Sequence, residues 1–150
     1  MHRFCLLVVI IGFASMAHVR AADGVPANLD AQAIRAQQAV IRSEVLAGAG
    51  RYAKLDVRDR DDLLRHQDRL AVLLRKVDNT SALPERRQID VFNTLEAISA
   101  IVNFDPDGRT ICRRERPIGS NRPLTSCMTV AQMREERDVS QSEMQRRGLL

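Results

Sequence analysis

Aromatic residues and lysine are scarce in this 150-residue chain, which has no tryptophan, one tyrosine and four phenylalanines. The lysines are Lys54 and Lys76, so arginine carries almost all of the positive charge, and the formal net charge is +4. Proteins that bind single-stranded nucleic acid combine a basic groove with aromatic stacking surfaces. No aromatic residue falls in the arginine-rich stretch 109–122, and we therefore expect no nucleic acid among the partners.

Long hydrophobic runs are also lacking, except for one at the N-terminus. A basic start is followed by an apolar run over residues 4–17, and Val19 and Ala21 fit the −3 and −1 positions of a cleavage site. This layout is typical of a secretory signal peptide. The alternative is a membrane anchor, but the run is shorter than the about 20 apolar residues that a spanning helix needs. We predict a signal peptide over residues 1–21 with cleavage after Ala21, a periplasmic or secreted mature form, and no transmembrane segment in that form.

Cysteine and histidine are few, with three of each. Removal of the signal peptide leaves Cys112, Cys127 and His66. A cysteine pair in an oxidising compartment is expected to form a disulfide. The alternatives are a metal site or a reactive thiol, but two cysteines and one distant histidine do not supply the four ligands of a structural zinc. We predict a Cys112–Cys127 disulfide, with no metal site and no cofactor.

The sequence offers no group of residues that marks an active site. His66 has no neighbour in the sequence that identifies it as a general base. Asp59, Asp61 and Asp62 lack the spacing and the glycine of a calcium-binding loop, and acids in a first helical turn suit the helix dipole. We therefore predict no catalytic residue and a protein that is not an enzyme.

Hydrophobic periodicity predicts three helices within residues 30–104. The first begins at the N-cap Asp30 and ends at Gly48, the second spans residues 57–78, and the third begins near Pro84. Single apolar stripes and short connections indicate a small antiparallel helical bundle in a mainly α fold. Residues 22–29 are interpreted as a flexible leader. The predicted stripes consist of Ile34, Gln37, Val40/Ile41 and Val45 in the first helix; Leu63, His66/Gln67, Leu70, Leu73/Leu74 and Val77 in the second; and Val91/Phe92, Leu95, Ile98 and Ile101/Val102 in the third.

Residues 105–150 are predicted to form a disulfide-closed loop and a polar terminal helix. If Cys112 and Cys127 pair across a hairpin, the turn falls between Gly119 and Ser120, but Pro123 lacks the N–H that strand pairing there would need. We therefore predict short paired arms near the cysteines and an irregular loop over residues 115–123. Thr129 and Gln132 have the spacing of a capping box, which predicts an exposed fourth helix fixed mainly at its start.

The loop between the cysteines concentrates positive charge, because it contains several arginines and a single acid, Glu115. Arginine binds phosphate and carboxylate in bidentate fashion. A restrained basic loop is therefore a candidate site for an anionic envelope component or an acidic protein surface; the alternative is a solvated surface without a function of its own. The candidate contact residues are Arg113, Arg114, Arg116, Asn121 and Arg122.

Three segments, DRDDLLRHQDRL, FNTLEAISAIVN and ICRRERPIGSNR followed by Cys127, resemble a family of small exported proteobacterial proteins whose activity is uncharacterised. The resemblance covers about Arg51 to Arg137, and its most specific part is the CRRE…GSNR…C loop. It implies export and a shared architecture, and it implies no catalytic residue. The sequence as a whole predicts a non-enzymatic binding or interaction module; the alternative is a structural or assembly protein that packs through helix faces with itself or a partner.

Overall fold

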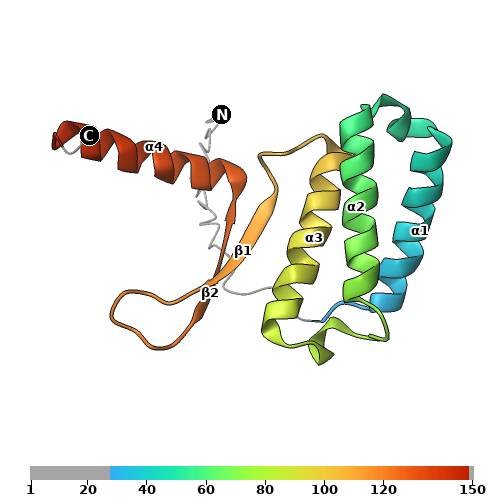
Figure 1. Cartoon of the computed structure of the whole chain (residues 1–150), viewed down its shortest axis with the longest axis horizontal. Helices are drawn as coiled ribbons and strands as arrows, with labels where there is room; N and C mark the ends of the chain where they lie inside the picture. Colours follow the sequence, from blue (N-terminus) through green and yellow to red (C-terminus); the bar gives the residue numbers. More distant parts are fainter. Residues whose placement is uncertain (1–27, 149–150) are drawn as a thin grey trace, which may run out of the picture.

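The computed structural model describes residues 28–148, so the predicted signal peptide, its cleavage site and almost all of the predicted leader lie outside the described residues. Three antiparallel helices form a bundle, a two-stranded hairpin lies along the third, and a fourth helix projects from the hairpin (Figure 1). The predicted mainly α fold with a disulfide-closed hairpin is confirmed. In chain order the elements are α1 (Ala31–Ala47), the 3-10 turn η1 (Gly50–Lys54), α2 (Val57–Leu73), the 3-10 turn η2 (Thr80–Ala82), α3 (Glu85–Asn103), β1 (Thr110–Glu115), β2 (Leu124–Thr129) and α4 (Val130–Arg146).

The ends of α1 follow the sequence prediction, but its buried face does not. Asp30 accepts hydrogen bonds from the first-turn N–H groups, and Gly48 ends the helix in the left-handed conformation (φ 60°) that glycine adopts without strain. Gln37 and Val40, placed on the apolar stripe by prediction, are exposed. Gln38 is half-buried instead, and its side-chain and backbone oxygens accept hydrogen bonds from Gln67 on α2. The predicted stripe was therefore wrong at these two positions, since Gln38 shares the buried face with Ile34, Ile41 and Val45, which pack against the core.

Helix α2 ends at Leu73, five residues before the predicted end at Asp78. Arg35 of α1 donates to the carbonyl oxygens of Leu74 and Val77, which satisfies acceptors left free at the end of a helix. Lys76 then takes a positive φ of 57°, and the chain leaves the helical path. Lys76 therefore lies beyond the helix rather than in its last turn.

The core has two clusters of buried side chains at different levels of the bundle. One gathers around Leu70, Leu74, Val91 and Ile98, and the other contains Val45, Leu63 and two residues of the α1–α2 connection, Tyr52 and Leu55. Helix α3 lies between α2 on one side and the hairpin on the other (Figure 1), so it supports both parts of the molecule.

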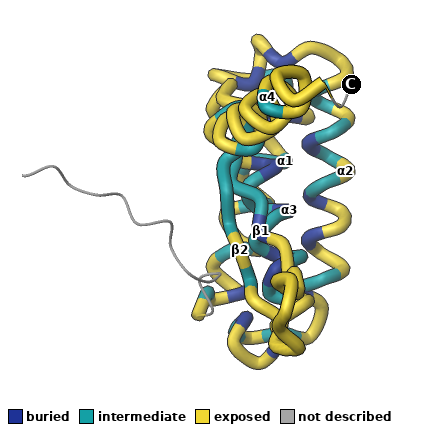
Figure 2. The backbone as a smooth tube through the Cα atoms, turned by 90° about the vertical axis from the view of Figure 1, so that its left-hand side faces the viewer, coloured by how far each residue is buried: buried dark blue, intermediate teal, exposed yellow. Residues whose placement is uncertain are grey.

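The hairpin has the register that the cysteine positions predicted. Cys112 pairs with Cys127, and pairing continues to Glu115 opposite Leu124. The irregular segment is therefore 116–123, one residue shorter than predicted because Glu115 is paired, and it ends at Pro123 as expected. Figure 2 shows the hairpin in front of the bundle, with intermediate burial mainly at the end of the strands near α4 and an exposed loop at the other end. Thr129, the last residue of β2, opens α4 through the predicted capping box.

Candidate functional site: the disulfide-held hairpin

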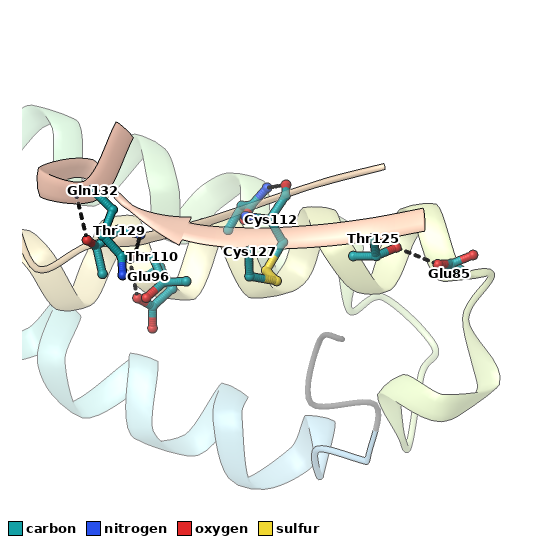
Figure 3. Close-up of a disulfide and its surroundings, with 9 residues drawn as sticks. Glu85, Glu96, Thr110, Cys112, Thr125, Cys127, Thr129 and Gln132 are labelled. Carbon is teal, nitrogen blue, oxygen red and sulfur yellow. Dashed lines mark hydrogen bonds between the residues drawn. A yellow bond between two sulfur atoms is a disulfide. The ribbon is translucent and has the colours of Figure 1, made fainter. Parts of the chain in front are cut away.

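Side chains of α3 complete the backbone hydrogen bonding of β1. The Asn93 amide accepts a hydrogen bond from the Cys112 N–H (2.8 Å) and donates one to the Cys112 carbonyl oxygen (2.9 Å). One turn further along α3, the Glu96 carboxylate accepts from the Thr110 N–H at 2.8 Å (Figure 3). These side chains occupy the place of a third strand, so the edge of β1 is closed by a helix.

The Cys112–Cys127 disulfide joins the two strands at directly opposite residues (Figure 3). Cys112 is 1% exposed and faces α3, and the two Cα atoms are 4.0 Å apart. The predicted disulfide is confirmed, and it is consistent with an oxidising compartment. It restrains the segment that carries the candidate arginines.

Strand alternation divides these arginines between two faces of the hairpin. Arg114 follows the buried Cys112 by two residues and therefore lies on the face toward α3, where it forms an ion pair with Glu85 at 3.2 Å. Thr125, directly opposite in register, donates a hydrogen bond to the same carboxylate. Arg113 lies on the opposite face. Arg113 and Arg114 therefore direct their side chains to opposite faces, although both residues border the hollow described below.

The loop presents the remaining candidates to solvent. Arg116, Asn121 and Arg122 are all exposed. Within residues 28–148, neither Arg116 nor Arg122 has an acidic partner within ion-pair distance. The Ser120 hydroxyl accepts a hydrogen bond from the Arg122 N–H, which orders this part of the loop.

A basic hollow of about 740 Å³ lies between the start of α3 and the hairpin. Arg86 of α3 lines it together with Arg113, Arg114 and Arg116, and the acids in its lining are Asp90 and Glu115. Asp90 lies 3.6 Å from Arg69 on α2, so part of its charge is already compensated. Sequence reasoning missed Arg86 because it lies far from the cysteines in the chain; only its place in the first turn of α3 could have suggested it.

A second polar cluster lies where the bundle meets the base of the hairpin. Asp59, Asp62 and His66 from α2 and Arg109 from the segment before β1 line a hollow of about 520 Å³. Burial lowers the pKa of His66 below its ordinary value of 6.5, and neighbouring arginines, Arg109 first, add to the effect. The spacing of the three α2 residues places them on one helix face, which the sequence could have revealed. It gave no sign that Arg109, grouped with the basic loop, lies here instead.

The face of the hairpin that points away from α3 meets α4 at an open corner. Ile111, Arg113 and Met128 line the hairpin side of this corner, and Met133 and Arg137 line the helix side. Helix α4 has no buried residue and is held mainly near its start, where Arg134 forms a bidentate ion pair with Asp107. This confirms the predicted exposed helix fixed at its start.

The chain matches no protein-family model, no curated protein and no solved structure. Within residues 28–148, no helix is long and apolar enough to span a membrane. In the same range, no three histidine, cysteine or carboxylate side chains lie together in a way that would hold a metal ion. The arguments about function therefore depend on the geometry of the hairpin and its surroundings.

Proposed function

We propose that this protein is a non-enzymatic binding module that takes the phosphate or carboxylate groups of an anionic partner on its disulfide-held hairpin. The observation that carries the proposal is the basic hollow, which is lined by Arg86 of α3 and by Arg113, Arg114 and Arg116 of the hairpin. Arg116 and Arg86 have no ion-pair partner among the described residues. Convergent guanidinium groups on a restrained backbone bind an anion with little further ordering cost.

The disulfide and the α3 side chains supply that restraint. The strand that carries Arg114 is fixed to α3 through Asn93 and to β2 through Cys127. Arg122 and Asn121, exposed in the loop below, extend the basic surface beyond the hollow. An anionic envelope component or an acidic protein face would therefore meet a preformed arginine surface.

Binding to vesicles tests the proposal. The wild type is expected to bind vesicles containing phosphatidylglycerol, and separately polyglutamate, more tightly than vesicles of phosphatidylcholine alone. The double variant Arg86→Glu/Arg116→Glu should lower the affinity for at least one of the anionic probes at least about tenfold, because it reverses two charges in the hollow.

The matched control is Arg58→Glu/Arg75→Glu, which makes the same change in net charge at two exposed positions outside the hollow. It should retain most of the affinity. An equal loss in both double variants would attribute the binding to overall charge and would contradict a site at the hairpin, as would a wild type that binds neither probe.

We further propose that the protein works outside the cytoplasm, in the periplasm or as a secreted protein. The supporting observations are the N-terminal pattern of residues 1–21 and the buried disulfide. Mass spectrometry of the protein purified from its native source without reductant is expected to find a chain that begins at Ala22 and has no free thiol. An intact N-terminus or two free thiols would contradict export.

A further inference from the structure

The outer edge of β2 carries unpaired backbone groups. The N–H groups of Thr110 and Cys112 point toward α3, so their register partners Thr129 and Cys127, and Thr125 two residues earlier, direct their N–H groups away from β1. The Thr129 N–H is bonded to Gln132. Within residues 28–148, the N–H groups of Thr125 and Cys127 donate no hydrogen bond.

Strand β2 itself carries none of the usual protection against strand pairing. Natural edge strands carry charges, prolines or a covering element. The sequence of β2, LTSCMT, contains no charge and no proline, and α3 closes the edge of β1 rather than that of β2. Figure 2 shows β2 at the outer margin of the hairpin.

We propose that β2 pairs antiparallel with β2 of a second copy of this chain, about a two-fold axis at Ser126. In this register Thr125 faces Cys127 of the other copy, and each of these residues donates and accepts one hydrogen bond. All four free N–H groups of the two strands are then paired. A shift of the axis to Thr125 would bring in Pro123, which has no N–H, and a shift to Cys127 would require the Thr129 N–H that Gln132 already holds.

The side chains and charges around the edge fit a second copy. On the face away from α3, the half-exposed Leu124 (56%) would lie opposite Met128 of the other copy. The groove beside the β2 edge is lined by Glu135 and Glu136 at the start of α4. In the antiparallel pair, the first residues of β2 in one copy lie beside the last residues of β2 in the other. The exposed Arg122 of one copy therefore comes near Glu135 and Glu136 of the other. The surface is therefore complementary to itself in both hydrogen bonding and charge.

Cysteine cross-linking tests the register. Ser126 and its copy would form a pair without mutual hydrogen bonds, with Cα atoms about 4.5 Å apart. The chain already bridges the equivalent kind of pair at Cys112–Cys127, where the Cα atoms are 4.0 Å apart. Ser126→Cys is therefore expected to give a disulfide-linked dimer on oxidation. Peptide mapping should find the link between the two introduced thiols, with the native disulfide intact.

Leu124→Cys is the matched control on the same face of the same strand. Its thiol would face Met128 of the other copy and lie more than about 10 Å from its own counterpart, which is beyond the reach of a disulfide. The pair Leu124→Cys/Met128→Cys should restore cross-linking. Equal cross-linking of Ser126→Cys and Leu124→Cys, or none with Ser126→Cys, would overturn the proposed register.

Removing a single donor tests the pairing without a thiol. Thr125→Pro deletes an N–H that points away from β1, and Thr125→Val keeps this N–H while it loses the same hydroxyl contact to Glu85. In sedimentation experiments at matched concentrations, Thr125→Pro should raise the dimer dissociation constant about tenfold or more relative to Thr125→Val. Circular dichroism checks that both variants are folded. A wild type that stays monomeric at high micromolar concentration would overturn the proposal, as would equal dissociation constants.

Discussion

At the scale of single residues, Asn93 decides how the hairpin is seated. Its amide accepts a hydrogen bond from the backbone of Cys112 and donates one to it. One side chain thus makes the two hydrogen bonds that a neighbouring strand would otherwise make. Leaving a part-buried backbone donor and acceptor without partners costs about 1–3 kcal/mol.

Asn93→Ala is therefore expected to lower the free energy of unfolding by about 1–3 kcal/mol, measured by urea denaturation of the oxidised protein. Asn121→Ala, in the exposed loop, is the control and should change it by less than about 0.5 kcal/mol. An Asn93→Ala variant as stable as this control would mean that water replaces the amide at no cost.

His66 should make stability depend on pH. Because burial and the neighbouring arginines lower its pKa in the folded state, the unfolded state binds more protons once the pH falls below about 6.5. The free energy of unfolding should then decrease as the pH is lowered, until the folded-state pKa is passed. His66→Gln is expected to flatten this dependence between about pH 7.5 and 5.5, measured by urea denaturation. An unchanged slope in this variant would assign the effect to other groups.

Residues with local roles could be predicted from the sequence, and residues with long-range roles could not. Asp30 caps α1 and Thr129 caps α4 by binding N–H groups a few residues further along the chain. A short stretch of sequence is therefore enough to predict each cap. Arg35 caps α2 from 39 residues away, and Arg109 joins His66 through the packing of the hairpin on the bundle. Such contacts exist only after the elements have packed.

At the scale of elements, α4 depends on its first turn more than on packing. The capping box links Thr129 and Gln132, and the helix has no buried residue to support it. Loss of an N-cap hydroxyl costs about 1 kcal/mol, and this cost should stay local.

Thr129→Ala is therefore expected to speed amide hydrogen exchange about fivefold in α4 while the α3 amides keep their protection. Ser140→Ala, in the middle of the same helix, is the control and should not speed exchange. Faster exchange throughout the bundle after Thr129→Ala would show that α4 is coupled to the core.

The hairpin as an element is stabilised by its disulfide, which spans a sequence separation of 15 residues. In the chain-entropy description, closing a loop of this size with a disulfide stabilises the folded state by about 3 kcal/mol, because it restricts the unfolded chain. Cys112→Ala/Cys127→Ala should lower the unfolding midpoint in urea and weaken binding to phosphatidylglycerol vesicles, because the arginines lose their restraint. A double variant with unchanged affinity would separate binding from the disulfide.

At the scale of the whole molecule, the bundle and the hairpin share α3 as a common support (Figure 1). The sequence predicted the bundle, the hairpin register and the polar last helix, because each follows from periodicity or index pairing. It did not predict that Arg113 and Arg114 would face opposite sides, or that Arg86 would join the hollow. These facts depend on the strand orientation that Asn93 and the buried Cys112 impose.

The whole-molecule charge distribution predicts a salt response. Exposed charges more than about 8 Å apart are largely screened at physiological ionic strength. Vesicle binding by the wild type should therefore weaken steadily as salt is raised, and the Arg86→Glu/Arg116→Glu variant should respond less steeply. Cosedimentation with vesicles over a salt series measures both slopes, and parallel slopes would contradict a role for the hollow.

The direct join between β2 and α4 gives the molecule a mechanical property. Thr129 ends the strand and caps the helix, so no flexible linker absorbs rotation between them. A helix of 17 residues is about 25 Å long, so a tilt of the strand pair by roughly 10° would carry the far tip through about 4 Å. If a partner moves β1 relative to Asn93, the far end of α4 would therefore move further than the hairpin does. The helix would act as a rigid lever arm.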